Sequence, residues 1–360
     1  MSNIREIRQK EAEKAWGENK KSIINSCPRF GKILTSINII KNNNYNKVLI
    51  SIPRLDIKES WENDFIKWGF RPTNVEYTTH KSGKKFKGWK GDIFIIDEIQ
   101  EASENELKEF KNIVLNNNTL GLSGTITRKT EFKILGILNL GISYKYLIEQ
   151  GVEEKILVDY KINIHTVDLD DKELIYKTNS GKIVSENTRF GQYIFIRNKL
   201  IKEKKPVYFL DLKCIQILQS SLAKKEYTKK LLNQYKNERI LVFCGTTEIA
   251  DNLGIASYHS KTKEKNTLKD FSEGIGKTLA TVKMAQSGIT IKPINKGIIN
   301  YTSGNSEDTA QKICRFLGME YDNLEKIADI HIICSNTDFE KERLKTGLQF
   351  FDPTKIINYK

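Results

Sequence analysis

Cysteine and histidine are scarce in this sequence, and neither residue type forms a cluster. The 360 residues include five cysteines and four histidines, with no Cys-x-x-Cys pair and no histidines grouped beside the cysteines. A structural zinc site needs such ligands close together, and a disulfide framework needs an even number of cysteines at regular spacing. The pattern argues against both. We therefore expect no zinc and a reducing compartment such as the cytoplasm.

Long apolar runs are also missing. No segment approaches the length of a membrane span, and the first residues lack the charged-then-apolar pattern of a signal peptide. These two absences predict a soluble protein without a membrane partner.

Acidic residues are too few to balance the basic ones. The sequence has 59 Lys and Arg against 45 Asp and Glu, which gives a net charge of +14. A basic surface of this size suits a polyanion, most simply the phosphate backbone of a nucleic acid. The alternative is a lysine-rich surface that carries its charge without binding a partner.

Short apolar segments alternate with helical patterns in both halves of the sequence. Residues 48–52, 93–96 and 240–244 are examples of these segments. Apolar strands separated by helices predict an α/β fold in which a mainly parallel sheet is covered by helices on both faces. The length suggests two such domains. In parallel sheets ligands bind beyond the carboxyl ends of the strands, and the polar motifs of this sequence fall there.

Residues 163–235 have the pattern that is hardest to interpret. Within them, residues 207–210 are apolar and predict a strand, whereas residues 223–235 form a lysine-rich helical pattern. We interpret the lysines of this helix as a solvated face, with a nucleic-acid contact as the alternative.

A phosphate-binding loop is indicated by residues 23–34. A short apolar run is followed by a turn and then by Gly31-Lys32 at the start of a helical pattern. Backbone N–H groups at a helix N-terminus face an anion, and the lysine reaches the outer phosphates. The pattern G-x-x-x-x-G-K-[ST] is met in part, because Ser26 replaces the first glycine and Ile33 replaces the hydroxyl residue that would touch Mg²⁺. The alternative is a turn whose lysine is solvated.

A second motif, Asp97-Glu98, ends the apolar segment at residues 93–96. Two adjacent carboxylates at a buried strand end are unfavourable unless a cation lies beside them. In a phosphate-loop fold the first acid holds Mg²⁺ through the nucleotide and the second polarises the attacking water. The alternative is an acidic pair stabilised by a helix N-terminus. The preceding loop and the following Ser123-Gly124-Thr125 favour the nucleotide site.

The order of these motifs resembles that of superfamily-two helicases. Gln9 to Ala12, Pro28 to Lys32, Asp97 to Gln100 and Ser123 to Thr125 are similar to the Q-type motif and motifs I, II and III. Residues 51–54, 59–61 and 67–69 resemble the phage UvsW-like and type I–III restriction-helicase branch. In the second half, residues 240–253, 286–290 and 311–318 resemble motifs IV, V and VI.

The resemblance implies two tandem RecA-like domains. These would be an ATP-binding domain at residues 1–148 and a C-terminal helicase domain at residues 160–360, joined by a crossover linker at 149–159. It leaves no room for a further accessory domain. The protein would be a minimal motor core.

The resemblance also implies an ATP-dependent helicase or translocase, that is, an ATP hydrolase with ATP and Mg²⁺ as cofactors. Gln9 would read the adenine edge, Asp97 would hold Mg²⁺ and Glu98 would orient the water, while Arg315 would neutralise charge on the transferred phosphoryl group. The residues implied in catalysis are Lys32, Asp97, Glu98, Gln311 and Arg315. Those implied in nucleotide binding are Gln9, Ser26, Cys27, Pro28, Arg29, Phe30, Gly31, Lys32, Ile33 and Gly288.

Two further groups of residues follow from the resemblance. Ser123, Gly124 and Thr125 would couple the two domains. Contacts to the nucleic-acid backbone would come from Pro53, Arg54, Gly245, Thr246, His259 and Thr281. For His259, a hydrogen bond at a strand end is an equal alternative. Because phosphate contacts carry little sequence information, such contacts predict a preference for structure over sequence.

Two positions depart from the family pattern. Ile33 stands where a hydroxyl residue is usual, and Gly318 stands where motif VI usually has a second arginine. Both changes remove groups that act on Mg²⁺ or the γ-phosphate, and we expect a slow ATPase. Water can replace the hydroxyl ligand, since Mg²⁺ keeps several waters.

The nature of the nucleic acid has a favoured answer and two alternatives. DNA is favoured over RNA because Asp97-Glu98-Ile99-Gln100 differs from the Asp-Glu-Ala-Asp of the commonest RNA class, and because the region of Trp61 and Trp68 points to DNA. The substrate would be duplex or branched DNA in replication or recombination, whose proteins are candidate partners of a monomer in the cytoplasm (the host cytoplasm if phage-encoded). The alternatives are an RNA helicase and a nucleotide-gated DNA-binding module with weak turnover.

Overall fold

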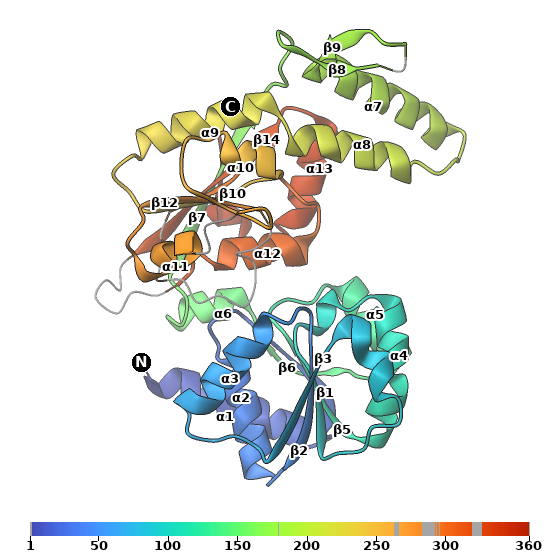
Figure 1. Ribbon diagram of the computed structural model, residues 1–360, viewed down its shortest axis with the longest axis vertical. Coiled ribbons are helices and arrows are strands. Elements are labelled where there is room, and N and C mark those ends of the chain that lie inside the picture. The colour runs from blue at the N-terminus through green and yellow to red at the C-terminus, as the bar shows by residue number, and fades with distance from the viewer. Residues whose placement is uncertain are drawn as a thin grey trace. The chain divides into compact units, whose positions relative to one another are not determined.

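The computed structural model describes residues 2–178, 180–262, 266–282, 292, 294, 296–318 and 326–359. The chain divides into two compact units, one ending at Val158 and the other beginning at Asp159. Each unit is built on one parallel sheet that carries helices on its faces (Figure 1). The predicted fold class, two α/β units with parallel sheets, is confirmed.

The first unit contains a six-stranded sheet in the order β3-β2-β4-β5-β1-β6, with parallel pairing throughout. Helices α1 to α3 lie on one face and α4 and α5 on the other, which is why the central strands are apolar along their whole length (Figure 1). The strands are β1 (Lys21–Ser26), β2 (Lys47–Ile52), β3 (Asn74–Thr79), β4 (Ile93–Ile96), β5 (Asn118–Ser123) and β6 (Ile142–Tyr146). The helices are α1 (Ser2–Gly17), α2 (Lys32–Asn42), α3 (Ile57–Lys67), α4 (Glu104–Asn116), α5 (Arg128–Leu138) and α6 (Ile148–Glu153).

His80 is a buried titratable group of this unit. It follows β3, its Nδ1 lies 2.8 Å from Ser51 Oγ, and its ring meets the edge of Phe110 on α4. Burial lowers the pKa of His80 to about 4. The native unit therefore keeps this imidazole neutral at pH values where an unfolded chain would protonate it.

We expect the contribution of His80 to the stability of the first unit to fall as pH decreases through the range from 6.5 to 4. Its folded pKa lies below the unfolded value, so the unfolded state binds more protons there, and this contribution decreases by about 2 kcal/mol between pH 7.5 and 5. The raised pKa of Asp97 in the same unit acts in the opposite direction, because there the folded state binds the additional proton. All four tryptophans lie in this unit, so urea unfolding followed by tryptophan fluorescence measures it. His80→Gln should remove the His80 contribution and lose less stability than the wild type over this range. A variant whose midpoint shifts with pH as much as the wild type would contradict this.

The second unit contains a seven-stranded parallel sheet in the order β11-β12-β10-β13-β14-β7-β15. The last strand returns to pair with the first strand of the unit, β7, at one edge. The strands are β7 (Asp159–Val167), β10 (Ile240–Phe243), β11 (Ser257–Tyr258), β12 (Thr278–Thr281), β13 (Lys296–Ile299), β14 (Ile327–Ser335) and β15 (Ile356–Tyr359). The associated helices are α9 (Leu222–Gln234), α10 (Thr247–Asp251), α11 (Asn266–Glu273), α12 (Ser306–Cys314) and α13 (Asp338–Gly347).

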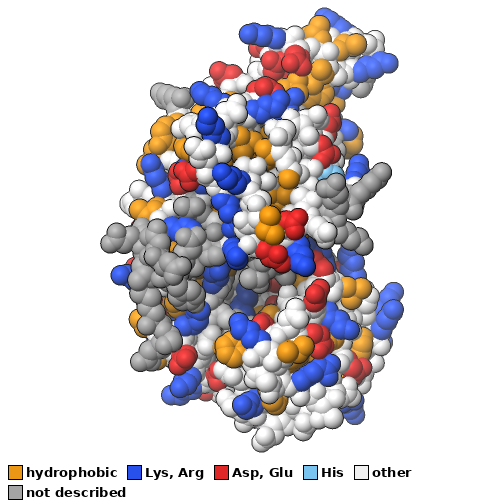
Figure 2. All heavy atoms as spheres, turned by 60° about the vertical axis from the view of Figure 1, so that its left-hand side comes forward, with side chains coloured by type: hydrophobic (Ala, Val, Ile, Leu, Met, Phe, Trp, Pro, Cys, Tyr) orange, Lys and Arg blue, Asp and Glu red, His pale blue; other side chains and the backbone are white. Residues whose placement is uncertain are grey.

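An insertion between β7 and α9, residues 168–221, lies outside this sheet. It forms a hairpin of β8 (Leu174–Lys177) and β9 (Ile183–Ser185), followed by α7 (Glu186–Lys202) and α8 (Tyr208–Gln219) (Figure 1). Figure 2 shows apolar side chains gathered over this insertion, with lysine and arginine side chains among them. The insertion belongs to the second unit and was not anticipated from the sequence.

The prediction of a strand at residues 207–210 is wrong, because these residues lie at the start of α8. Its apolar residues Cys214, Ile217 and Leu218 recur at helical spacing and are buried with Phe190 of α7. A short apolar run does not distinguish a strand from a buried helix. Here the packing against α7 decides for the helix.

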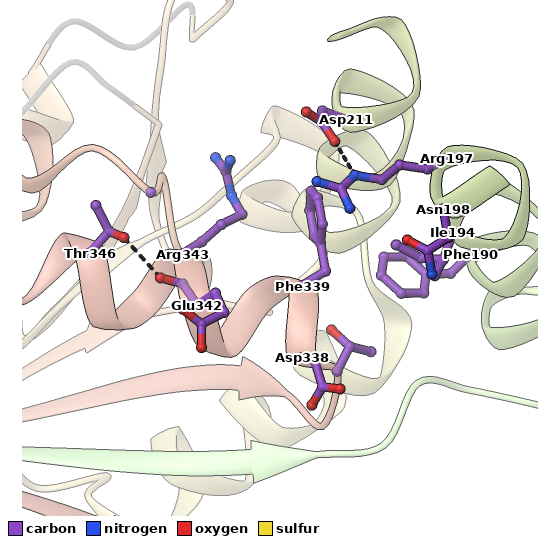
Figure 3. A pocket seen from close by; sticks show the side chains of 12 residues that line it. Phe190, Ile194, Arg197, Asn198, Asp211, Asp338, Phe339, Glu342, Arg343 and Thr346 are labelled. Carbon is purple, nitrogen blue, oxygen red and sulfur yellow. Dashed lines mark hydrogen bonds and ion pairs between the residues drawn. The ribbon is translucent and has the colours of Figure 1, made fainter. Parts of the chain in front are cut away.

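The insertion is fastened to α13 across a cavity of about 560 Å³. Arg197 of α7 pairs with Asp211 of α8, and its guanidinium lies 5.2 Å from the ring of Phe339 on α13. Arg343 lies 5.6 Å from the same ring, so that Phe339 stands between two guanidinium groups (Figure 3). The contact of Arg197 with Phe339 joins the insertion to the sheet-bearing part of the unit, and Arg343 stabilises the same ring from within α13.

All five cysteines are buried and free. In the phosphate-loop segment, burial raises the pKa of the Cys27 thiol to about 12. Among the described residues, no helix combines the length and the apolar character that crossing a membrane requires.

Candidate nucleotide-binding site

The loop between β1 and α2 has the backbone shape that anion binding requires. Arg29 and Gly31 both adopt left-handed conformations, with φ of 64° and 96°, and α2 begins at Lys32. Alternating right- and left-handed residues turn successive N–H groups toward one side, and the helix N-terminus adds its own free N–H groups. A side chain at Gly31 would be strained by its φ of 96°, and a Cβ there would collide with Gln9 Nε2.

Two contacts hold this loop from outside. Gln9 of α1 is buried, and its Nε2 donates to the carbonyl oxygen of Phe30 at 2.7 Å. The ring of Phe30 lies beside those of Tyr144 and Tyr146 on β6, at centroid distances of 6.0 and 5.4 Å. Gln9 therefore touches the loop directly, whereas the two tyrosines were not anticipated from the sequence.

Lys32 meets motif II within the first unit. Its Nζ lies 3.2 Å from Glu98 Oε1, and a Cβ on Gly124 would come within 3.2 Å of the same nitrogen. Burial alone would lower the pKa of Lys32 and raise that of Glu98, but their mutual attraction outweighs this. The pKa of Lys32 is raised and that of Glu98 is lowered, so both are charged at neutral pH. Three sequence motifs thus converge at one point.

Asp97 is held by two neutral donors. Trp61 Nε1 donates to Oδ2 at 3.0 Å, and the backbone N–H of Glu98 donates to Oδ1 at 3.0 Å. Burial raises the pKa of the Asp97 carboxyl above its ordinary value, and the charge of Glu98 adds to this. A nearby cation would lower the pKa of Asp97 again and keep the carboxylate ionised. This is expected of a carboxylate that binds a metal ion.

Motif III ends β5, beside β1 in the sheet. Ser123 is buried; its Oγ donates to the carbonyl oxygen of Thr125 at 3.1 Å and accepts from the Thr125 N–H at 3.3 Å. The register places Ser123 opposite Asn25 of β1. The turn at Gly124 is thereby fixed next to Lys32.

The residues around this loop fit a triphosphate and a magnesium ion. Four buried polar atoms at this edge of the sheet have no hydrogen-bond partner among the described residues: Asn25 Oδ1, Ser26 Oγ, Gln100 Oε1 and Thr125 Oγ1. Native proteins rarely leave buried polar atoms unsatisfied, so such a group is typical of a ligand site. For Mg²⁺, the carboxylate of Asp97 is available, whereas Ile33 offers no oxygen.

Motif VI lies in the second unit on α12. Gln311 and Arg315 are four residues apart and half-buried, which places them on one face, while Lys312 points inward to Tyr301 and Asp308. The predicted helix through residue 318 is too long, since α12 ends at Cys314 and Arg315 caps it. Gly288, another predicted nucleotide contact, lies outside the described residues.

The predicted nucleic-acid contacts fall in two groups. Pro53 and Arg54 follow β2 in the first unit, on the segment before α3. Two of the second-unit residues form hydrogen bonds within that unit. Thr246 caps α10 through its hydroxyl. His259 Nδ1 accepts from the Lys261 N–H, and its Nε2 donates to Asp251 Oδ1.

The two remaining second-unit residues have different surroundings. Gly245 is half-buried, and a Cβ on it would collide with the backbone of Gln219. Thr281 is fully buried, and its Oγ1 has no hydrogen-bond partner among the described residues. The hydrogen bonds of His259 with Asp251 and Lys261 correspond to the alternative stated for this residue, a hydrogen bond at a strand end.

The chain resembles known helicases over most of its length. The helicase conserved C-terminal domain family matches residues 223–317. The DNA 3′-5′ translocase XPB2 of Sulfurisphaera tokodaii is 22% identical over an alignment of 344 positions, which covers 86% of this chain and 77% of that protein.

Solved structures show the same fold. A fragment described as the HsdR subunit of a type I restriction enzyme from Vibrio vulnificus YJ016 is 14% identical with a TM-score of 0.60, covering 98% of this chain and 68% of that chain. A variant of S. cerevisiae Dbp5 bound to RNA and ADP BeF3 is 11% identical with a TM-score of 0.63, covering 98% of this chain and 89% of that chain. The solved structures share the tandem RecA-like fold of the two units, and together with the ordered motifs these matches make the chain similar to superfamily-two helicases.

Proposed function

We propose that this protein is an ATP-dependent helicase or translocase that acts on duplex or branched DNA. The observation that carries the proposal is the convergence of Lys32, Asp97, Glu98 and Gly124 beside the anion-binding loop. These groups come from three strand ends of one sheet, and a simple strand-to-helix turn would not need them together. Residues 1–148 and 160–360, joined by 149–159, would be its two motor domains.

Each of these residues has a separate task in ATP hydrolysis. Lys32 and the N–H groups of the loop would bind the outer phosphates, and Asp97 would hold Mg²⁺. When bound, the metal ion neutralises charge on the phosphate oxygens. Glu98, kept ionised by Lys32, would accept a hydrogen bond from the attacking water and orient it. Arg315 is proposed to neutralise charge on the phosphoryl group that is transferred.

The Lys32–Glu98 ion pair gives this site a defined resting arrangement. Without nucleotide, the two charges compensate each other at 3.2 Å. A γ-phosphate would compete with Glu98 for Lys32, because a phosphate attracts the ammonium more strongly than a single carboxylate does. Nucleotide binding would therefore release the Glu98 carboxylate toward water. Hydrolysis would restore the pair.

DNA is the proposed substrate, and placement in the phage UvsW-like and restriction-helicase branch belongs to the same proposal. The net charge of +14 supports a polyanion of either kind. XPB2, a DNA translocase, is a relative that resembles this chain over most of its length, and the Dbp5 structure contains RNA. The sequence of motif II, Asp97 to Gln100, supports DNA as described above.

Phosphate release from ATP in the presence of different nucleic acids tests this proposal. We expect forked DNA to raise the rate by about tenfold, which corresponds to about 1.4 kcal/mol of transition-state free energy. Single-stranded DNA should stimulate less, and RNA least. Higher stimulation by RNA would favour an RNA helicase. Tight ATP-dependent DNA binding without phosphate release would instead favour a nucleotide-gated binding module.

A further inference from the structure

A tryptophan outside the ATP-binding motifs touches the proposed metal-binding carboxylate. Trp61 on α3 is fully buried and donates from Nε1 to Asp97 Oδ2, while Oδ1 of Asp97 accepts from the Glu98 N–H. Each oxygen thus has one fixed hydrogen bond and keeps a lone pair for a further partner. Since both donors are neutral, they orient the carboxylate without cancelling its charge.

The acceptor of this indole is a buried carboxylate. A buried tryptophan needs an acceptor for its N–H, and a backbone carbonyl is sufficient. Trp16 in the same unit meets this need with the carbonyl oxygen of Thr119, also at 3.0 Å. The half-buried Trp89 donates to a carboxylate, Glu76 Oε1, at 2.8 Å, so a carboxylate acceptor alone does not set Trp61 apart. Trp61 differs because it is fully buried and its acceptor is the carboxylate that the proposed mechanism assigns to Mg²⁺.

Helix α3 connects this hydrogen bond to a surface segment. It begins at Ile57, directly after the segment that contains Pro53 and Arg54, and Trp61 lies about one helical turn further on. Ile57, Trp61 and Phe65 form the buried face of the helix, with the rings of Trp61 and Phe65 6.0 Å apart. A displacement at the start of α3 would therefore reach the indole through one rigid turn.

We propose that Trp61 is a positioning residue that orients Asp97 for Mg²⁺ and couples this carboxylate to the segment at Pro53 and Arg54. This rests on the proposed function, because it takes the metal-binding role of Asp97 and the strand-contact role of the segment from there. It adds a route by which a bound nucleic-acid strand changes the affinity for the magnesium–nucleotide complex. The residue is argued to act through Asp97 and not on the substrate itself.

Trp61→Phe removes the N–H and keeps most of the apolar volume. The matched control is Trp16→Phe, which loses a buried indole hydrogen bond of the same length in the same unit but leaves Asp97 untouched. The affinity of the full chain for a fluorescent ADP analogue is measured by titration with and without Mg²⁺. We expect Trp61→Phe to lower the gain in affinity from Mg²⁺ by about tenfold, as is typical for loss of an outer-shell partner of a metal ligand. Affinity without Mg²⁺ should be unchanged in both variants.

The same titrations with single-stranded DNA test the coupling. DNA should raise the affinity for the magnesium–nucleotide complex in the wild type and in Trp16→Phe, and this effect should be lost in Trp61→Phe. A full Mg²⁺ effect and a full DNA effect in Trp61→Phe would overturn the inference. A wild type that binds no nucleotide at all would overturn the proposed function as well, and is recognised before any variant is compared.

A second measurement does not require Trp61→Phe to fold. A variant with Phe at positions 16, 68 and 89 leaves Trp61 as its single tryptophan, since the chain has four. Its emission should change when the nucleotide is added with Mg²⁺ and should not change with the nucleotide alone. Identical emission in both conditions would contradict a contact between the indole and the metal-binding carboxylate.

Discussion

Glu98→Gln should reduce the rate of ATP hydrolysis by at least about 100-fold, because positioned general bases contribute 10²–10⁴-fold. It should at the same time tighten nucleotide binding. The wild-type carboxylate is held by Lys32 at 3.2 Å and by Gln100 Nε2 at 2.5 Å. A neutral amide leaves the Lys32 ammonium without its counter-charge, and the phosphates then bind it without first displacing a carboxylate.

Single-turnover phosphate release and nucleotide titration measure these two effects separately. The control is Glu104→Gln, on the exposed first turn of α4, where the carboxylate pairs with Lys108 at the surface. This change should leave both quantities within experimental error, since exposed pairs contribute little. If Glu98→Gln loses nucleotide affinity together with activity, the residue holds the loop in place and does not act on water.

The convergence of three motifs could be predicted from the sequence because it follows from sheet geometry. Gly31-Lys32, Asp97-Glu98 and Ser123 to Thr125 each follow an apolar strand, and the carboxyl ends of parallel strands share one edge. The strand order remained open at that stage. The structure places β5 between β4 and β1, so that the residues after all three strands are neighbours. This is why Lys32 faces both Glu98 and Gly124.

The contacts that hold the phosphate-binding loop and Asp97 in place could not be predicted, because they come from elements whose sequence patterns are weak. Strand β6 carries Tyr144, Lys145 and Tyr146, and this mixture of aromatic and charged residues does not repeat as a buried parallel strand would. Its place at the sheet edge accounts for the polar residues, and its tyrosines pack on Phe30, which is distant in the sequence. The Trp61–Asp97 hydrogen bond likewise joins residues 36 positions apart.

In the second unit, the lysine-rich helix at residues 223–235 is another element whose contacts could not be predicted from the sequence. Helix α9 is where the pattern predicted it, and Lys229 and Lys230 lie on its outer side. The interpretation as a solvated face is nevertheless wrong for Lys224, which is fully buried. The partner of Lys224 is a carboxylate more than a hundred residues away in the sequence. The helical pattern around the lysine does not reveal this partner.

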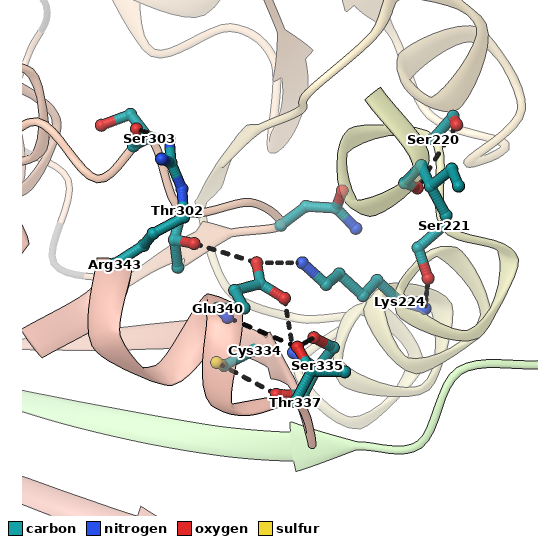
Figure 4. Close-up of polar contacts among 12 residues, drawn as sticks. Ser220, Ser221, Lys224, Thr302, Ser303, Cys334, Ser335, Thr337, Glu340 and Arg343 are labelled. Atoms are coloured by element: carbon teal, nitrogen blue, oxygen red, sulfur yellow. Dashed lines mark hydrogen bonds and ion pairs between the residues drawn. The ribbon is translucent and has the colours of Figure 1, made fainter. Parts of the chain in front are cut away.

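Lys224 and Glu340 form a buried ion pair between α9 and α13 (Figure 4). Glu340 also accepts from Thr302 Oγ1 at 2.9 Å and from the Ser335 N–H at 2.7 Å. The carboxylate thus joins β14, the segment after β13 and both helices. Lys224→Met should lower the free energy of unfolding of the second unit by about 3–5 kcal/mol, because it leaves a buried carboxylate without its cation.

The intact ion pair contributes less to the free energy of unfolding than the loss expected for Lys224→Met suggests. Burying both ions has a large desolvation cost, so replacing both partners is often close to neutral. In Lys224→Met/Glu340→Gln, the amide oxygen can still accept from the Ser335 N–H and the amide NH2 can donate to Thr302 Oγ1, and no unpaired charge remains. We expect this double variant to recover most of the stability. A coupling energy in the double-mutant cycle then measures how much of the single-variant loss is the unpaired charge.

Urea unfolding followed by far-UV circular dichroism, with tryptophan fluorescence in parallel, separates the two units, since the second unit has no tryptophan. The fluorescence transition should stay in place while the remaining dichroism transition moves. Lys225→Met, one residue along α9 and 3.6 Å from Glu226 in a surface pair, is the matched control and should change stability by less than about 0.5 kcal/mol. A double variant that is as unstable as Lys224→Met would contradict this expectation. It would show that the ion pair itself stabilises the contact between the helices, and that the loss in Lys224→Met does not come from the unpaired charge of Glu340.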